Sequence, residues 1–199
     1  MIHQIIHDVS AHPDFAYGVL FMAALLEAVP VVGTFVPGST TILSLSALIA
    51  TGDLGLVAVL ASVMGGAFVG DGTAFWFGHR HRGKLNRVWP LNRYPEVVRQ
   101  SEAVFEKYGG AAVLVARFLP PVRAFVPVVA GALGMTPQRF YPRSVIAIAL
   151  WAPAHVLPGY LAGAAYHRAG AMAEQLVLPV LAGAVAIAIA IWAYRRWAA

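Results

Sequence analysis

Two arginines and several prolines interrupt an otherwise apolar run over residues 108–138. Arg117 and Arg123 stand six positions apart, and Pro120 and Pro127 lie beside them. An arginine at the centre of a bilayer costs about 2.5–3.5 kcal/mol on insertion scales, so two of them imply an anionic partner, water or both. Proline breaks a helix by removing a backbone donor, which membranes tolerate only where the backbone faces protein or a wet cavity. The run therefore predicts a re-entrant hairpin whose tip forms the floor of a polar site.

The rest of the chain has the composition of an integral membrane protein. Hydrophobic residues make up 59% and charged residues only 12%, against about 25% charged in soluble proteins. No cysteine is present, and His3 and His7 have no third ligand near them, so we predict no metal site and no cofactor. The net charge of +5 comes from residues between the apolar spans, which predicts an anionic membrane surface as partner rather than nucleic acid.

A second interrupted run, residues 15–52, contains Glu27 as its only formal charge. A continuous helix of that length would measure about 57 Å, nearly twice the roughly 30 Å of a hydrocarbon core. Pro30, Pro37 and Gly38 lie in its middle. We therefore predict another re-entrant hairpin, with Glu27 near its tip.

The remaining segments complete an all-α polytopic membrane protein with one domain over residues 1–199. Three transmembrane helices are predicted, and a basic loop with an interfacial amphipathic helix follows the first of them; the helices cover 54–78, 144–166 and 175–194, and the loop covers 79–107. Nearly all lysines and arginines outside the hairpins fall on one side under this arrangement. That side, with the C-terminus, is predicted to be cytoplasmic.

The two hairpins resemble each other. A shift of 90 positions aligns residues 30–37 with residues 120–127, and five of the eight pairs are identical. One crossing separates the hairpins, so the second is inverted relative to the first, as in many secondary transporters. The same shift places Glu27 opposite Arg117.

The matching positions leave two readings of the charges open. Glu27 and Arg117 are either a structural ion pair between the hairpin tips or part of a binding site. Arg123 favours the second reading, because its counterpart in the repeat is the uncharged Gly33. Unless Asp71 comes close, the site has an excess of positive charge, which suits a ligand such as phosphate.

Asp71 itself has two interpretations. It precedes the basic loop by a few residues, so it is either a shallow residue that pairs with Arg80 or Arg82, or a carboxylate that couples transport to an ion gradient.

Three motifs in the chain resemble those of the DedA family, also called SNARE-associated or VTT-domain proteins. The resemblance covers about residues 13–195 and rests on these segments: Arg117-x-x-Pro120-x-x-Arg123-x-x-x-Pro127-x-x-Ala130-Gly131-x-x-x-Met135-x-x-x-x-Phe140, then Glu27-x-x-Pro30 with Pro37-Gly38, and Gly70-Asp71-x-x-x-Phe75-x-x-Gly78. It implies a bacterial inner-membrane flippase that moves undecaprenyl phosphate, another polyprenyl phosphate or a phospholipid across the membrane for the cell envelope. By the same resemblance, Arg117 and Arg123 bind the phosphate.

Gradient coupling is also implied by the resemblance, with protons or sodium ions acting through Glu27 and Asp71. Two positions depart from the family pattern, since Ser39 stands where many members have an acid and Phe75 replaces a tyrosine. Either one of the two carboxylates carries the coupling alone, or the lipid equilibrates without a gradient.

Two other functions are weighed against transport. An intramembrane lipid-phosphate enzyme would also use arginines, but the chain has no Gly-x-Ser-x-Gly elbow and no carboxylate cluster for a metal pair, so we expect no enzyme and no catalytic residue. An ion channel is disfavoured because broken hairpins suit a gated, alternating site better than a continuous pore. A homo-oligomer is left open.

Overall fold

Helices account for the regular structure of the part of the chain that the computed structural model describes, residues 13–82, 91–119 and 122–169. Two of these helices are long and apolar enough to cross a membrane, Leu56–Arg80 and Pro137–Tyr166. The crossing predicted over 175–194 lies outside the described residues, as do His3, His7 and Pro120.

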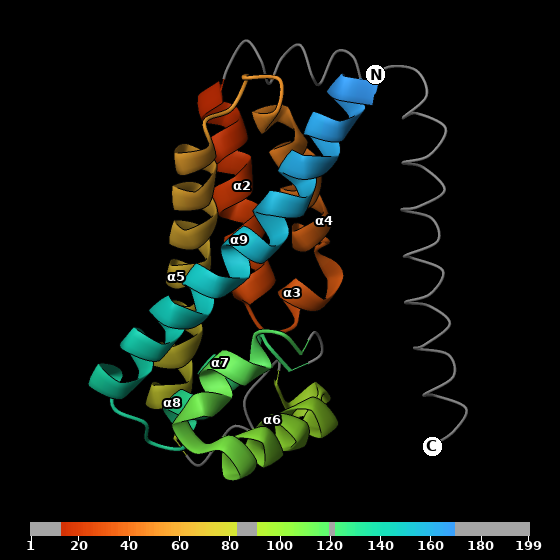
Figure 1. Ribbon diagram of the computed structural model, residues 1–199. Helices are drawn as coiled ribbons and strands as arrows, with labels where there is room; N and C mark the ends of the chain where they lie inside the picture. Colours follow the sequence, from red (N-terminus) through yellow and green to blue (C-terminus); the bar gives the residue numbers. More distant parts are fainter. Residues whose placement is uncertain (1–12, 83–90, 120–121, 170–199) are drawn as a thin grey trace.

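The first hairpin comprises residues 13–49. Helix α2, Pro13–Ala28, leads into the short helix α3, Val32–Phe35, and the chain then returns beside α2 as α4, Gly38–Ser46, followed by a 3-10 turn, Ala47–Ile49 (Figure 1). Pro30 and Pro37 occupy the two breaks, where a missing N–H and the restricted preceding residue disfavour helix. Val31 adopts a φ of 69°, a left-handed conformation that is uncommon for a β-branched side chain. The tip is thus a tight, strained turn.

Two long helices run through the molecule. Helix α5, Leu56–Arg80, corresponds to the crossing predicted over 54–78. Helix α9, Pro137–Ala169, crosses it (Figure 1) and begins earlier than the predicted 144–166. The predicted start was wrong because Arg139 and Arg143 were assigned to a loop. Proline at the first position of a helix loses no intrahelical hydrogen bond, and long arginine side chains can extend from a helix towards water.

The second hairpin, residues 112–132, is built from shorter pieces. Helix α6, Pro95–Tyr108, is the helix predicted within the basic loop; it ends where Gly109 takes a φ of 54°. A 3-10 turn then leads to α7, Ala112–Ala116, and after the interruption α8 runs over Val126–Ala132. Figure 1 shows α6, α7 and α8 at the end of the molecule opposite the start of α2.

Each hairpin has its own hydrophobic core. The first hairpin packs with the early part of α5 and the middle of α9 around residues that include Leu20, Ile42 and Val63. The second packs with the later part of α5 and the start of α9, where Phe75 stacks on Phe140 at a centroid distance of 4.2 Å. The hairpin tips lie between these two cores.

Two glycines bring the second hairpin against α5. A Cβ on Gly131 of α8 would collide with the carbonyl oxygen of Phe75, and a Cβ on Gly78 of α5 would collide with that of Val128. The two helices therefore touch backbone to backbone. This close approach is what fixes α8, and with it the adjoining turn that carries Arg123, relative to α5.

Candidate functional site

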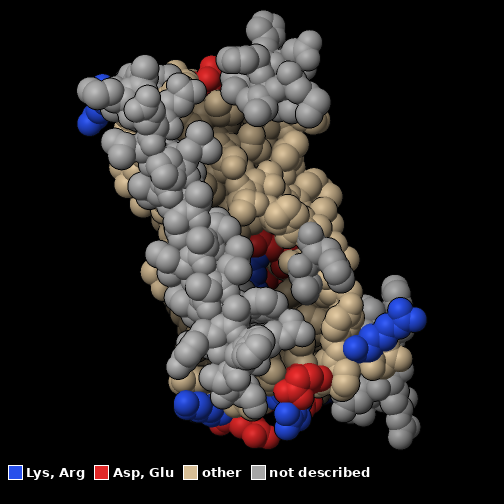
Figure 2. Space-filling model, turned by 90° about the vertical axis from the view of Figure 1, so that its right-hand side faces the viewer, with Lys and Arg blue, Asp and Glu red and all other residues tan. Residues whose placement is uncertain are grey.

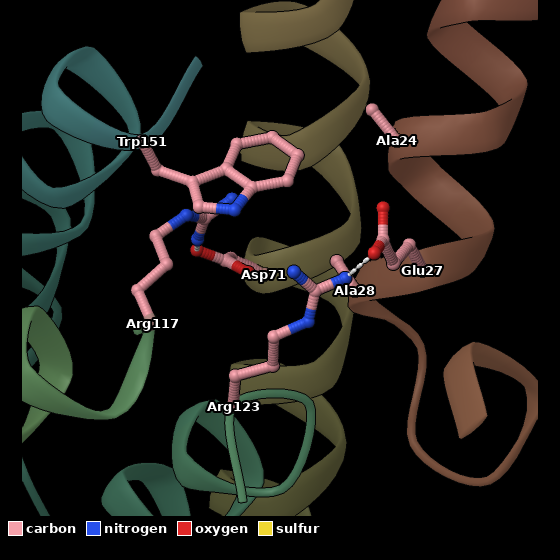
Figure 3. A pocket seen from close by; sticks show the side chains of 7 residues that line it. All are labelled: Ala24, Glu27, Ala28, Asp71, Arg117, Arg123 and Trp151. Atoms are coloured by element: carbon pink, nitrogen blue, oxygen red, sulfur yellow. Dashed lines mark hydrogen bonds and ion pairs between the residues drawn. The ribbon is translucent and has the colours of Figure 1, made fainter. Parts of the chain in front are cut away.

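Four charged side chains meet between the two cores. Glu27 comes from the end of α2, Asp71 from α5, Arg117 from the residue after α7, and Arg123 from the turn before α8 (Figure 3). With Trp151 of α9 they line a cavity of about 20 Å3, whose remaining walls are Ala24 and Ala28. That volume holds about one water molecule and is too small for a phosphate group. The structure thus brings together the four charged residues that the sequence singled out.

The ion pairs differ from the one considered as a structural alternative. Glu27 pairs with Arg123, and Asp71 pairs with Arg117. The alternative of a Glu27–Arg117 pair was wrong because a shift along the chain aligns positions in two hairpins but does not show which helix face each side chain occupies. Since Asp71 does come close, the two cations are balanced by two anions, and the cluster has no excess of positive charge.

Asp71 is buried rather than shallow, so the interpretation in which it pairs with Arg80 or Arg82 was wrong. Its side chain is 4% exposed and that of Arg117 is 11% exposed. One carboxylate oxygen, Oδ2, accepts hydrogen bonds from the Arg117 guanidinium and from the Ser144 hydroxyl, the latter at 2.8 Å. Ser144 is fully buried on α9. Three helical segments therefore converge on this one carboxylate.

Glu27 is held less completely. Its Oε1 accepts a hydrogen bond from the Ser39 hydroxyl and faces the Arg123 guanidinium, whereas its buried Oε2 has no hydrogen-bond partner among the described residues. The start of the returning helix α4 passes close by, since a Cβ on Gly38 would lie 2.5 Å from Oε2. Glycine is therefore required there for the hairpin to close around the carboxylate. Ser39 thus provides a hydroxyl partner for Glu27.

Trp151 links the two pairs. The guanidinium carbons of Arg117 and Arg123 lie 5.0 Å and 5.4 Å from its ring centroid, within the range of a cation–π interaction. Its indole N–H and the Nε of Arg117 are buried without a hydrogen-bond partner among the described residues. The sequence analysis missed Trp151. The signal was available, because this tryptophan lies in the middle of an uncharged span and not at its ends, where tryptophans anchor helices to the interface.

The cluster has spare hydrogen-bond donors even though its formal charges balance. Buried polar groups are nearly always hydrogen-bonded in folded proteins, so two unpartnered N–H groups beside two guanidinium groups form a set of donors awaiting acceptors. Phosphate oxygens are such acceptors. Within the described residues there is no group of three or more His, Cys, Asp or Glu that could hold a metal ion.

Access to the charged cluster is from the side of the molecule. Figure 2 shows acidic and basic side chains at the bottom of a hollow about halfway along the face that it presents, with uncharged described residues above it.

Comparison with known proteins shows one matching domain family and several similar membrane proteins. Residues 36–161 match the VTT domain. The chain is 32% identical over 194 residues to inner membrane protein YabI of Escherichia coli K12, covering 96% of this chain and 76% of that protein. It is 30% identical over 162 residues to protein DedA of the same organism, covering 78% and 72%. No solved structure matches.

Proposed function

The chain belongs to the VTT-domain family, to which DedA and YabI are related, and from that membership we propose that it is a lipid transporter. Its substrate would be a lipid with an anionic phosphate headgroup, either a polyprenyl phosphate such as undecaprenyl phosphate or a phospholipid. The observation that carries the proposal is the buried cluster in which two arginines lie over Trp151 and are neutralised by acids from two other helices. The relative named an inner membrane protein supports the same membrane for this chain.

The proposed placement in the membrane has two inverted re-entrant hairpins. Each enters from its own side, and the tips meet near the midplane at the charged cluster. The arrangement in Figure 1, with the hairpins at opposite ends of α5, supports this placement. The basic residues gather at the α6 end, so we propose that this end faces the cytoplasm; the C-terminus, predicted on the same side, lies outside the described residues.

In the proposed mechanism the phosphate takes the place of Glu27 at Arg123. Guanidinium groups bind phosphate through paired, charge-assisted hydrogen bonds. Glu27 then loses its cation in a medium of low dielectric, where an unpaired carboxylate is costly, and it takes up a proton supplied by the bulk solution. Release of the phosphate reverses both steps. Proton movement and headgroup binding are coupled in this way even though Ser39 replaces the second acid.

Headgroup binding would also free the two hairpins from each other. The Glu27–Arg123 pair is the ion pair that joins the hairpin tips in the described part of the chain. Once it opens, one hairpin can rock against the surrounding helices and expose the site to the other side, while the lipid tail stays in the bilayer. No covalent step is required, so we propose a transporter and not an enzyme.

Translocation in proteoliposomes tests the proposal. Labelled undecaprenyl phosphate and phosphatidylethanolamine would be followed with and without a pH gradient. We expect Arg123→Ala to abolish translocation of the transported lipid, and Glu27→Gln to retain translocation but lose the response to the gradient. Arg99→Ala removes the same charge from the exposed face of α6 and should behave as the wild type.

Equal translocation by all of these proteins would rule out the proposed roles. Phosphate released from the lipid by the purified protein would indicate an enzyme instead, and unitary currents independent of the lipid tail would indicate a channel.

A further inference from the structure

A second polar hollow lies at the α6 end of the molecule, and we propose that it binds the headgroup of an anionic phospholipid. Its volume is about 340 Å3. Three segments form it: the end of α6 with the following turn, the connection between α8 and α9, and the start of α9. The lining residues are Phe105, Gly110, Leu133–Thr136, Arg139 and Arg143. It shares no residue with the central cavity, so it is a separate site.

The cations of this hollow are not neutralised. Arg139 and Arg143 both line it, no acidic residue does, and neither arginine has an ion pair among the described residues. The Arg143 guanidinium donates to the carbonyl oxygen of Arg139 at 2.6 Å and lies against the turn at Gly110, where a Cβ would come within 2.9 Å of its Nε. Arg82 does not line the hollow, but its guanidinium lies near Gly134, which does. Two unpaired cations in one hollow attract a phosphate.

The other walls are apolar, which favours the headgroup of a lipid over a soluble phosphate as the ligand of this hollow. Phe105, Leu133 and Met135 face the hollow, and Leu133 is 55% exposed. An exposed leucine beside arginines suits a phosphodiester whose glycerol and first methylene groups need an apolar surface. Basic pockets between helices at the cytoplasmic side of membrane proteins bind anionic headgroups by this combination. Phosphatidylglycerol has the required negative charge, whereas phosphatidylcholine is zwitterionic.

A lipid bound in this hollow would contact two segments that lead to the central charged cluster. Arg143 immediately precedes Ser144, which donates to Asp71, and Gly110 lies in the turn that leads into α7 and so to Arg117. A headgroup that contacts both segments would hold them together at the cytoplasmic end. We therefore expect phosphatidylglycerol to stabilise the folded protein.

Thermal unfolding of the full chain in detergent micelles tests this. Near saturation, short-chain phosphatidylglycerol should raise the melting temperature by about 5–10 °C, the shift expected for a ligand at about 100 times its Kd in a chain of this length. Phosphatidylcholine and inorganic phosphate should have little effect. An equal rise with inorganic phosphate would assign the hollow to free phosphate and overturn the lipid proposal.

Variants then locate the binding. Arg139→Gln with Arg143→Gln should lose the stabilisation by phosphatidylglycerol. Arg80→Gln with Arg93→Gln removes equal charge from the same end without touching the hollow and should keep the rise. Loss of the rise in both pairs would mean general attraction to a basic surface and would refute a specific site.

Leu133→Asp provides a test that leaves both arginines in place. Leu133 is exposed, so the change should not prevent folding, and a carboxylate at the hollow should repel the headgroup. An undiminished rise in this variant would overturn the proposal. Arg123→Ala should keep the rise, so failure of the transport mechanism and failure of this site give different results.

Discussion

The two buried ion pairs of the central cluster have the same chemistry but different support. Asp71 lies within the 25-residue helix α5 and receives hydrogen bonds from Arg117 and from Ser144 of α9. Glu27 accepts a hydrogen bond from Ser39 and lies one residue before the end of α2, and Arg123, like Arg117, lies in a turn. One oxygen of Glu27 is left without a hydrogen-bond partner among the described residues. The comparison indicates that the Asp71 pair holds the fold and that the Glu27 pair is the one able to open.

Helices place side chains more rigidly than turns do, which is why this difference matters for a transport cycle. The side chain of Arg123 is 16% exposed and that of Arg117 is 11% exposed, so exposure alone hardly separates them. Both arginines lie in turns, so the separation comes from the carboxylates. Asp71 lies in the middle of α5, whereas Glu27 lies at the end of α2 next to the strained turn at Val31, so reorienting Glu27 requires a smaller change of the backbone.

Removing the anion of the Asp71–Arg117 pair should cause the largest loss of folding stability. Asp71→Asn keeps the shape of the side chain but leaves Arg117 buried and unpaired, and breaking a buried pair in this way costs about 3–5 kcal/mol. We expect a fall in melting temperature of about 10 °C or more, measured in detergent micelles. Glu27→Gln should cost less, about 1–3 kcal/mol, because Arg123 can turn towards water.

The double variant Asp71→Asn with Arg117→Gln is the control for the larger loss. Replacing both partners leaves no buried charge, so much of the stability should return. If the Glu27 variant proved as unstable as the Asp71 variant, or if the double variant recovered nothing, the distinction between a fixed pair and a releasable pair would be lost.

A methyl group at Gly38 tests whether the backbone of the first hairpin closes tightly around Glu27. Gly38→Ala would place a Cβ 2.5 Å from Glu27 Oε2, and such overpacking costs about 1–3 kcal/mol. We expect lower stability and a disturbed gradient response in transport, because the carboxylate must move away from Arg123. Gly18→Ala is the matched control, since nothing lies within 4 Å of its Cβ. Equal effects of the two changes would show that the hairpin does not close on Glu27.

Much of the helical arrangement was predictable because proline and glycine mark where helices must end. The breaks at Pro30 and Pro37, and the start of a helix at Pro95, follow from missing donors and fixed φ angles. The start of α9 was missed because a helix can also begin at a proline and continue through another one. The predicted crossing begins at residue 144, but α9 begins at Pro137 and continues through Arg139, Pro142 and Arg143.

The membership of the charged cluster was also predictable, but its pairing was not. An ionisable residue within an apolar span is a candidate for a site wherever it occurs, which identifies Glu27, Asp71, Arg117 and Arg123. Helix α5 is apolar on most of its circumference, so no periodicity shows which face Asp71 occupies. The partners depend on the rotation of each helix about its axis, and that is fixed only by packing such as the contact of Gly131 with Phe75.

Trp151 contacts both pairs, so replacing it tests whether they are independent. Trp151→Leu removes the ring beneath both guanidinium groups, and a desolvated cation–π interaction contributes about 0.5–2 kcal/mol. We expect lower stability and weaker headgroup binding, measured by unfolding and by the lipid concentration at half-maximal translocation. Trp151→Phe keeps an aromatic ring and should retain part of the stability and part of the headgroup binding. Similar stability and binding in the Leu and Phe variants would mean that the ring contributes only by occupying volume.

The two serines give the smallest and most specific test. Ser144→Ala and Ser39→Ala each remove one hydroxyl that donates to a carboxylate, Asp71 in the first case and Glu27 in the second. A single hydrogen bond to a charged group contributes about 1.5–3 kcal/mol at most, and here each carboxylate keeps its arginine, so we expect about 1 kcal/mol or less in each case. If the Asp71 pair is fixed, Ser144→Ala should lower stability and leave the gradient response of translocation unchanged. If the Glu27 pair opens during transport, Ser39→Ala should alter that response, because the serine hydroxyl is a donor that Glu27 retains when Arg123 turns to the phosphate. The same response in both variants would contradict a division of labour between the two pairs.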